Sequence, residues 1–184
     1  MKNLVFSAML TVALSLLAGG LAKAAGLEDT LYLDLKDGRV VIELYPEVAP
    51  GHVERIKALT RKGFYDGVVF HRVIEGFMAQ TGDPTGTGMG GSDLPDLMAE
   101  FNNTKHMRGT LSMARSGDPD SANSQFFICF TAAAFLDGQY TAFGRVVSGM
   151  EHVDAIKRGD EANNGQVSDP DKILKLQVAA DVKA

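Results

Sequence analysis

Arg72 is the residue whose setting in the sequence most strongly suggests chemistry. Successive side chains of an extended strand point to opposite faces, so Arg72 would share its face with Phe70 and Ile74. An arginine among apolar side chains needs a partner or a task. Its guanidinium stays protonated at physiological pH and presents a planar fork of donors, so it needs no acid/base pair. The simpler alternative is a surface ion pair with Glu75 or Asp83.

A second segment has the same mixture of residue types. In residues 121–128, Gln125 directly precedes two phenylalanines. In the segment that contains Arg72, Gln80 follows Phe77 and Met78. These segments combine strand-forming apolar residues with uncharged amides and one arginine. That combination is not typical of plain core strands.

Other chemical signals fail on their context. The spacing G-x-G-x-x-G at 86–91 precedes a proline and two acids in Ser92–Asp96, where a dinucleotide-binding fold needs an apolar helix, so we interpret it as a surface loop. Cys129 lies in an apolar run and is typical of a small buried residue rather than a nucleophile. No metal site is expected, because no histidine forms a short ligand spacing with an acid or a cysteine. The histidines are His52, His71, His106 and His152.

The elements that must position these residues are mostly short strands. Two alternating runs, 31–35 and 39–44, flank Asp37-Gly38, which indicates a hairpin. Helical spacing predicts a first helix over 53–59, and a capping-box pattern that begins at Ser148 predicts a second helix that ends before Gly159. Further strands are expected at 68–74, 77–82, 110–114, 125–130, 141–147 and 173–179. We therefore expect a mainly β fold, a closed antiparallel β-barrel with helices covering its open ends.

The N-terminus has the pattern of a secretory signal peptide. An apolar stretch from Leu4 to Leu17 follows Lys2, and Ala22-Lys23-Ala24 offers the small residues of a cleavage site. The stretch is about 14 residues long, shorter than the roughly 20 that span a bilayer, which favours a signal over a membrane anchor. We expect residues 1–24 to be removed and residues 25–184 to form one exported domain without stable membrane insertion.

The composition limits the partners of this domain. The formal net charge is −5 at pH 7, and loss of Lys2 and Lys23 with the leader would make it more negative. An acidic body argues against nucleic acid as a partner. The single cysteine excludes an intramolecular disulfide, so stability must come from the core.

Seven short motifs run along the chain in a recognisable order. They are FHRVI (70–74), GFMAQ (76–80), GD (82–83), LSMA (111–114), SQFFI (124–128), LDG (136–138) and FGRV (143–146). In these motifs, over about residues 30–180, the chain resembles the cyclophilin-type peptidyl-prolyl cis–trans isomerases, in particular the bacterial, exported and periplasmic kind. The resemblance implies an eight-stranded β-barrel capped by two helices and an enzyme that needs no cofactor.

The resemblance also implies roles for particular positions. Arg72 matches the catalytic arginine of the family, and Gln80 matches the polar partner beside it. The pocket for the substrate proline ring would be formed by Phe77, Met78, Phe127 and Leu136. The further groove positions would be His71, Ala114, Arg115, Gln125, Phe135 and Tyr140.

Two of these positions depart from many eukaryotic members of the family. Phe135 stands where those members carry tryptophan, and Tyr140 stands where they carry histidine. Both departures resemble those of bacterial members. Because the indole N–H donor is missing, we expect weak cyclosporin binding with catalysis retained.

The implied reaction suits these residue types. Rotation about an X-Pro bond meets a barrier of roughly 18–20 kcal/mol but breaks no bond. The twisted nitrogen regains a lone pair, so a donor aimed at it binds the transition state far better than the planar ground state. One charge-assisted hydrogen bond of about 1.5–3 kcal/mol would supply roughly ten- to a hundredfold. The apolar pocket would hold the ring still while the preceding residue swings.

Two other functions remain open at this point. A barrel of this kind could bind proline-containing segments, or act as a chaperone, without significant turnover. A hydrolase could combine His71 and Asp83 with Ser112 or Ser124, although no G-x-S-x-G motif occurs. The expected partners are unfolded or partly folded exported proteins that contain proline, and a monomer is the expected state.

Overall fold

The computed structural model describes residues 26–183, so the predicted signal peptide over 1–24 lies outside the described residues. None of the helices in the described part of the chain is long and apolar enough to cross a membrane. The strands are β1 (Thr30–Leu35), β2 (Gly38–Leu44), β3 (Arg72–Ile74), β4 (Met78–Thr81), β5 (Thr110–Met113), β6 (Phe126–Cys129), β7 (Ala142–Ser148) and β8 (Lys175–Val178). The helices are α1 (Pro50–Arg61), α2 (Met150–Asp154) and the short 3-10 helices η1 (Leu27–Asp29), η2 (Ala134–Leu136), η3 (Glu161–Asn163) and η4 (Ala179–Asp181).

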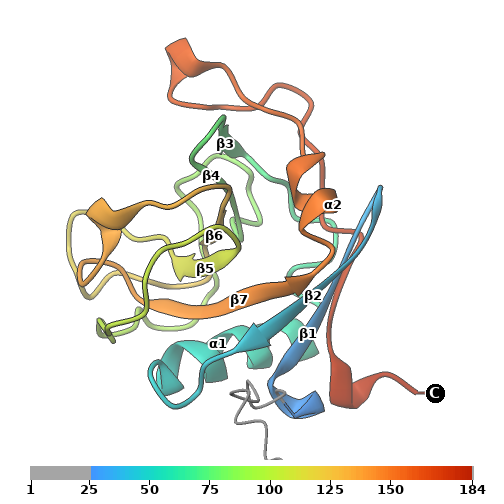
Figure 1. The fold of residues 1–184 in the computed structure, drawn as a ribbon, viewed down its shortest axis with the longest axis vertical. Helices are drawn as coiled ribbons and strands as arrows, with labels where there is room; N and C mark the ends of the chain where they lie inside the picture. Colours follow the sequence, from blue (N-terminus) through green and yellow to red (C-terminus); the bar gives the residue numbers. More distant parts are fainter. Residues whose placement is uncertain (1–25, 184) are drawn as a thin grey trace, which may run out of the picture.

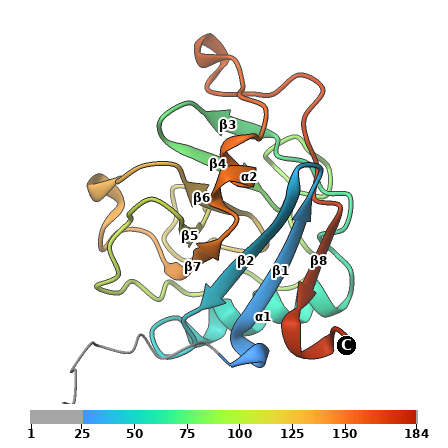
Figure 2. The same ribbon diagram turned by 45° about the vertical axis from the view of Figure 1, so that its right-hand side comes forward.

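The strands form one curled antiparallel sheet in the order β3-β4-β6-β5-β7-β2-β1-β8. This confirms the predicted strands and the mainly β fold with two α-helices, which lie at opposite ends of the curled sheet (Figure 1, Figure 2). The closed barrel is wrong. Within residues 26–183, the edge strands β3 and β8 form no ladder with each other, and the sheet is an open half-barrel.

The opening between the two edge strands is crossed by an irregular segment, residues 165–173. This segment makes only isolated bridges to the β3 side, one of them between Arg72 and Gln166. Asp169 has a positive φ of 53°, and Pro170 follows it without a backbone donor. These residues prevent a continuous ladder, which is why the barrel does not close.

The two α-helices differ from their predictions in length. The first helix is confirmed and extends over Pro50–Arg61, with Pro50 at its first position and Gly63 in the left-handed region behind it. The second helix is shorter than predicted. The capping box is wrong, because Ser148 is still part of β7 and the helix begins after Gly149, which has no side-chain cap.

Two apolar clusters lie on opposite faces of the sheet. In β6, Phe126 and Ile128 belong to the main core, whereas Phe127 and Cys129 belong to a smaller second cluster. This alternation follows from the period of two in a strand. Phe70 was expected to share the face of Arg72, but it packs in the main core because regular β3 begins only at Arg72.

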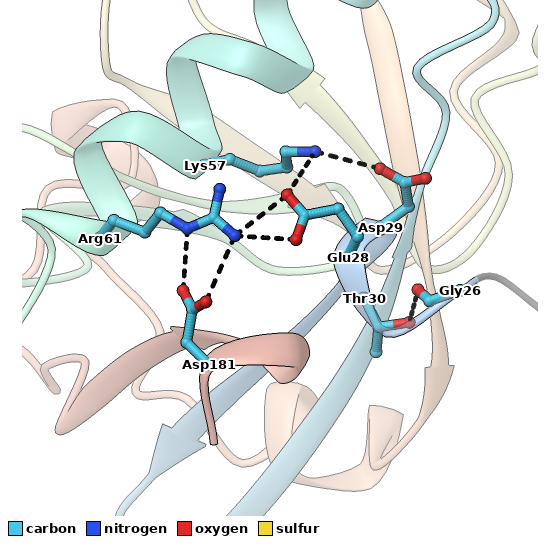
Figure 3. A network of polar contacts seen from close by, with 7 residues as sticks. All are labelled: Gly26, Glu28, Asp29, Thr30, Lys57, Arg61 and Asp181. Atoms are coloured by element: carbon cyan, nitrogen blue, oxygen red, sulfur yellow. Dashed lines mark hydrogen bonds and ion pairs between the residues drawn. The ribbon is translucent and has the colours of Figure 1, made fainter. Parts of the chain in front are cut away.

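A network of charged side chains joins both ends of the described chain to α1 (Figure 3). Arg61 pairs with Glu28 at 2.8 Å and with Asp181 at 2.8 Å. Lys57 pairs with Glu28 and Asp29, both at 3.2 Å. The partners of Arg61 are exposed, and exposed pairs contribute only about 0.2–1 kcal/mol each, so these pairs mainly fix the position of the chain ends against the helix.

Candidate active site

The register of the sheet brings Arg72 beside the second apolar cluster. Arg72 in β3 lies opposite Gln80 in β4, and Gln80 lies opposite Phe127 in β6. Residues paired across neighbouring strands point to the same face. The sheet therefore aligns a cation, an amide and an aromatic ring in one row on its outer face.

The guanidinium of Arg72 is held by neutral acceptors. Its Nη1 donates to Gln80 Oε1 at 3.1 Å, its Nε donates to the Asn164 carbonyl oxygen at 3.0 Å, and its Nη2 donates to Asn164 Oδ1 at 3.0 Å. Burial lowers the pKa of Arg72 from its ordinary value, but a guanidinium remains protonated in proteins. The alternative ion pairs are not formed, since Glu75 pairs with Arg158 and Asp83 is bonded elsewhere.

A chain of amides fixes the orientation of Gln80. Gln80 Nε2 donates to Gln125 Oε1 at 2.9 Å, and Gln125 Nε2 donates to the carbonyl oxygens of Gly88 and Gly90 at 3.1 and 2.8 Å. Carbonyl oxygens only accept, so both amides can be placed in only one way. Gln80 must then present its oxygen to Arg72.

Asp83 stabilises the glycine-rich loop at the end of this chain of amides. Its buried carboxylate accepts from the backbone N–H groups of Thr85, Gly88 and Gly90 at 2.7, 2.6 and 3.1 Å. The Thr85 hydroxyl also donates to Asp83 Oδ1, at 2.8 Å. Together the hydroxyl and the backbone donors outweigh the cost of burial and hold the pKa of Asp83 at about 2. The backbone N–H groups of this glycine-rich loop are thus turned inward onto a carboxylate of the same chain.

Replacing Asp83 by asparagine should therefore destabilise the protein by about 1–3 kcal/mol at pH 7, because an amide nitrogen would face N–H donors. A lowered carboxyl pKa stabilises the fold above the unfolded value, and this contribution is lost as pH falls from about 4 to 2. Urea unfolding at stepped pH should show the gap between wild type and D83N closing over that range. A gap that stays constant down to pH 2 would contradict this role.

A cavity of about 530 Å³ lies beside the amide chain. Its lining includes Gln80, Ala114, Arg115 and Gln125 from the predicted groove, together with the loop 88–92. The cavity is therefore continuous with the groove and has a mixed polar and apolar wall.

The predicted proline pocket coincides with the second apolar cluster. Met78, Phe127 and Leu136 are buried there, and Phe77 packs against them. The Phe127 ring meets Tyr140 edge to face, with centroids 6.1 Å apart. Met78, Phe127 and Leu136 come from β4, β6 and η2, so the pocket is assembled by the fold and not by one segment.

A buried polar chain supports Phe127 from behind. The His106 ring stacks against Phe127, with centroids 6.4 Å apart. His106 Nε2 lies 2.9 Å from Ser112 Oγ, and its Nδ1 lies 3.1 Å from Asp137 Oδ1. This resembles a hydrolytic triad in order, but Ser112 is completely buried and cannot reach a substrate.

The hydrolase that the sequence left open is not assembled. Ser124 donates to the Gly82 carbonyl oxygen, and Asp83 is enclosed by its loop. His71 is buried, and its ring nitrogens have no hydrogen-bond partner among residues 26–183. Burial lowers the pKa of His71, so its ring is neutral at neutral pH.

The remaining predicted groove residues lie around the same face. Arg115 lies over the Tyr140 ring, with its guanidinium carbon 4.4 Å from the ring centroid, and donates to the Gln139 carbonyl oxygen. Ala114 packs against the second cluster. Phe135 is 66 % exposed at the rim of the groove, and its ring centroid lies 5.4 Å from that of Phe77. All predicted site residues are thus brought to one region.

Cys129 is buried as expected. Burial raises the pKa of its thiol to about 12, so it is not a thiolate nucleophile at neutral pH. No group of three or more potential metal-ligating side chains occurs in the part of the chain that the structure describes.

Sequence reasoning missed two parts of the site, namely Asn164 and the chain formed by His106, Ser112 and Asp137. The Asn164-Gly165 dipeptide is a turn signal that could have indicated a left-handed residue. Nothing local could have paired it with Arg72, which lies 92 residues away. His106 was considered only as a metal ligand.

Comparisons with known proteins show the family to which the chain belongs. The family model described as cyclophilin type peptidyl-prolyl cis-trans isomerase/CLD matches residues 30–178. A Brucella suis chain described as "Probable peptidyl-prolyl cis-trans isomerase" is 55% identical over 183 residues, covering 94% of this chain and 93% of that one. Peptidyl-prolyl cis-trans isomerase B of Bacillus subtilis is 46% identical, covering 71% of this chain and 92% of that one.

Solved structures give the same result. Cyclophilin AquaCyp293 from Hirschia baltica superposes with a TM-score of 0.77 at 27% identity, covering 86% of this chain and 77% of that one. A Cryptosporidium parvum cyclophilin type isomerase, crystallised in the presence of the dipeptide ala-pro, gives 0.74 at 30% identity, covering 81% and 98%. The chain belongs to the cyclophilin family of enzymes, the peptidyl-prolyl cis–trans isomerases.

Proposed function

We propose that this isomerase is exported and accelerates rotation about X-Pro bonds in unfolded or partly folded exported proteins, with Arg72 as the donor to the twisting amide. The observation that carries the mechanism is the neutrality of the partners of Arg72. Asn164 and Gln80 accept its hydrogen bonds, and among residues 26–183 no carboxylate forms a salt bridge with it. Its positive charge therefore remains available to a substrate next to an apolar pocket.

The apolar cluster supports a proline ring as the group that is held. Met78, Phe127 and Leu136 form a buried wall without charge, which suits a ring with no N–H to satisfy. The adjoining cavity suits a residue farther along the same peptide. Rotation would then occur between a fixed ring and a mobile preceding residue, with Arg72 contacting the amide nitrogen and the carbonyl oxygen of the proline.

The alternative is a module that binds proline-containing segments without turnover. Such a module needs the pocket but not the arginine. Partial burial of a charge without a counter-charge costs free energy, and a simple binding module gains little in return. The charge on Arg72 therefore favours catalysis over simple binding.

We also propose that the protein acts as a periplasmic monomer. The proposal rests on the signal pattern over residues 1–24 and on a groove that is assembled from one chain. The acidic charge suits a soluble partner for unfolded chains rather than a binder of nucleic acid.

Refolding of a client tests this function directly. A substoichiometric amount of the mature protein should accelerate the slow, proline-limited refolding phase of an unfolded exported protein, in proportion to enzyme concentration. Refolding that improves only at stoichiometric amounts, with an unchanged slow phase, would support the binding module instead. A client without a proline-limited phase serves as the control.

A further inference from the structure

Asn164 accepts two hydrogen bonds from Arg72, although the two residues are 92 positions apart in the sequence. Its carbonyl oxygen accepts from Nε and its Oδ1 accepts from Nη2, each at 3.0 Å. Asn164 alone therefore accepts the hydrogen bonds from the Nε/Nη2 edge of the guanidinium. Gln80 contacts only Nη1, from the opposite strand.

The loop that carries Asn164 is fixed to β3. Val73 donates to the Gly165 carbonyl oxygen at 2.8 Å, and Gly159 donates to the Val73 carbonyl oxygen at 2.9 Å. Within the loop, Gly165 donates to the Asp160 carbonyl oxygen at 2.8 Å. A Cβ on Gly165 would collide with Ile74, so this loop can approach the strand only with glycine at that position. Asn164 is therefore held at a set distance from Arg72.

The backbone of Asn164 is suited to this task. Its φ is 53°, in the left-handed region that asparagine tolerates better than most residues. This conformation turns both oxygens of one residue toward the same guanidinium. Most other side chains would adopt it only with strain.

The hydrogen bonds leave a defined pair of donors unused. A guanidinium has five N–H groups. Asn164 takes the one on Nε and one on Nη2, and Gln80 takes one on Nη1. One N–H on each of Nη1 and Nη2 remains for a ligand.

We propose that Asn164 is a positioning residue that sets the plane of the Arg72 guanidinium, so that these two N–H groups meet the twisted X-Pro amide. The inference rests on the proposed role of Arg72. Asn164 touches no substrate and acts only through Arg72. Without Asn164 Oδ1, Arg72 Nη2 loses its hydrogen-bond acceptor, and the guanidinium can rotate out of the plane that the reaction needs.

The test is Asn164→Gly, because glycine adopts the left-handed backbone and keeps the carbonyl acceptor while removing Oδ1. We expect kcat for cis/trans exchange to fall about three- to tenfold, with KM within about twofold of wild type, because the donor pair is misaligned in the transition state. The melting temperature should not fall. Wild-type kcat in N164G would overturn the proposal.

Two variants separate positioning from general loop damage. Asn163→Ala removes a neighbouring amide that contacts Gln166 and not Arg72, and it should keep wild-type kcat. Asn164→Asp keeps an acceptor at the same place and should keep Arg72 ordered. An equal loss of kcat in N163A and N164G would overturn the proposal.

Nitrogen-detected NMR of the Arg72 side chain gives a readout that does not depend on turnover. The Nη2 protons should show restricted rotation in wild type and N164D, and averaged signals in N164G. Restricted rotation that persists in N164G would overturn the inference. If the wild type shows no catalysed exchange at all, the proposed function fails, whereas this spectrum still decides whether Asn164 holds the guanidinium.

Discussion

Replacing Arg72 by alanine is expected to lower kcat/KM for cis/trans exchange by about a hundredfold. The lost charge-assisted donor accounts for roughly ten- to a hundredfold. The chain of amides formed by Gln80 and Gln125 also loses the cation that it orients, so the substrate amide is held less well. The free energy of unfolding should change by less than about 1 kcal/mol, because Arg72 is only partly buried and its acceptors can bind water. Peptide isomerisation kinetics and urea unfolding on the same samples provide both measurements.

Arg145→Ala is the matched control for this change. Arg145 lies on β7 and pairs with Glu43, away from the second cluster, so its loss removes one arginine without touching the groove. Its kcat/KM should equal that of wild type. If R145A and R72A lost activity equally, the effect would be one of net charge and not of Arg72.

Phe127 should have the second large effect, and it should act on both stability and turnover. Its ring is 95 % buried between His106 and Tyr140. Truncation to alanine should destabilise the protein by about 3–5 kcal/mol. That is a large part of the 5–15 kcal/mol that is typical of a domain, so F127A can fail to fold at ordinary temperature.

Phe127→Leu separates the two effects. Leucine keeps most of the apolar volume and should cost less than about 1.5 kcal/mol. The flat wall of the pocket is lost, so we expect kcat/KM to fall about tenfold, mainly through KM, as apolar contact with the proline ring decreases. A folded F127L with wild-type KM would mean that the proline ring does not bind against Phe127.

The local parts of the fold could be predicted from the sequence. The β1–β2 hairpin does form, although Lys36 and Asp37 make its turn and Gly38 already pairs with Leu35. Pro50 and Gly63 do bound α1. Closure of the barrel could not be predicted in the same way, because it depends on whether residues 165–173 pair with β3. The left-handed residue Asp169 interrupts this pairing, and an alternating strand pattern does not indicate such a residue.

The candidate site was predictable only where a resemblance linked distant segments. Period-two alternation placed Arg72 correctly on a strand, yet it put Phe70 on the wrong side because the strand begins later than expected. The register then aligns Gln80 and Phe127 with Arg72. Asn164 is recognised only in three dimensions, because its partner is set by the path of the loop.

Two-dimensional exchange NMR on an X-Pro peptide tests the central claim most directly, with wild type and R72A measured side by side at the same fraction of bound peptide. We predict cis/trans cross-peaks that grow with catalytic amounts of wild type and are nearly absent for R72A, although both proteins shift the peptide resonances. Cross-peaks of equal strength for the two proteins, or peptide binding to wild type without exchange, would contradict it.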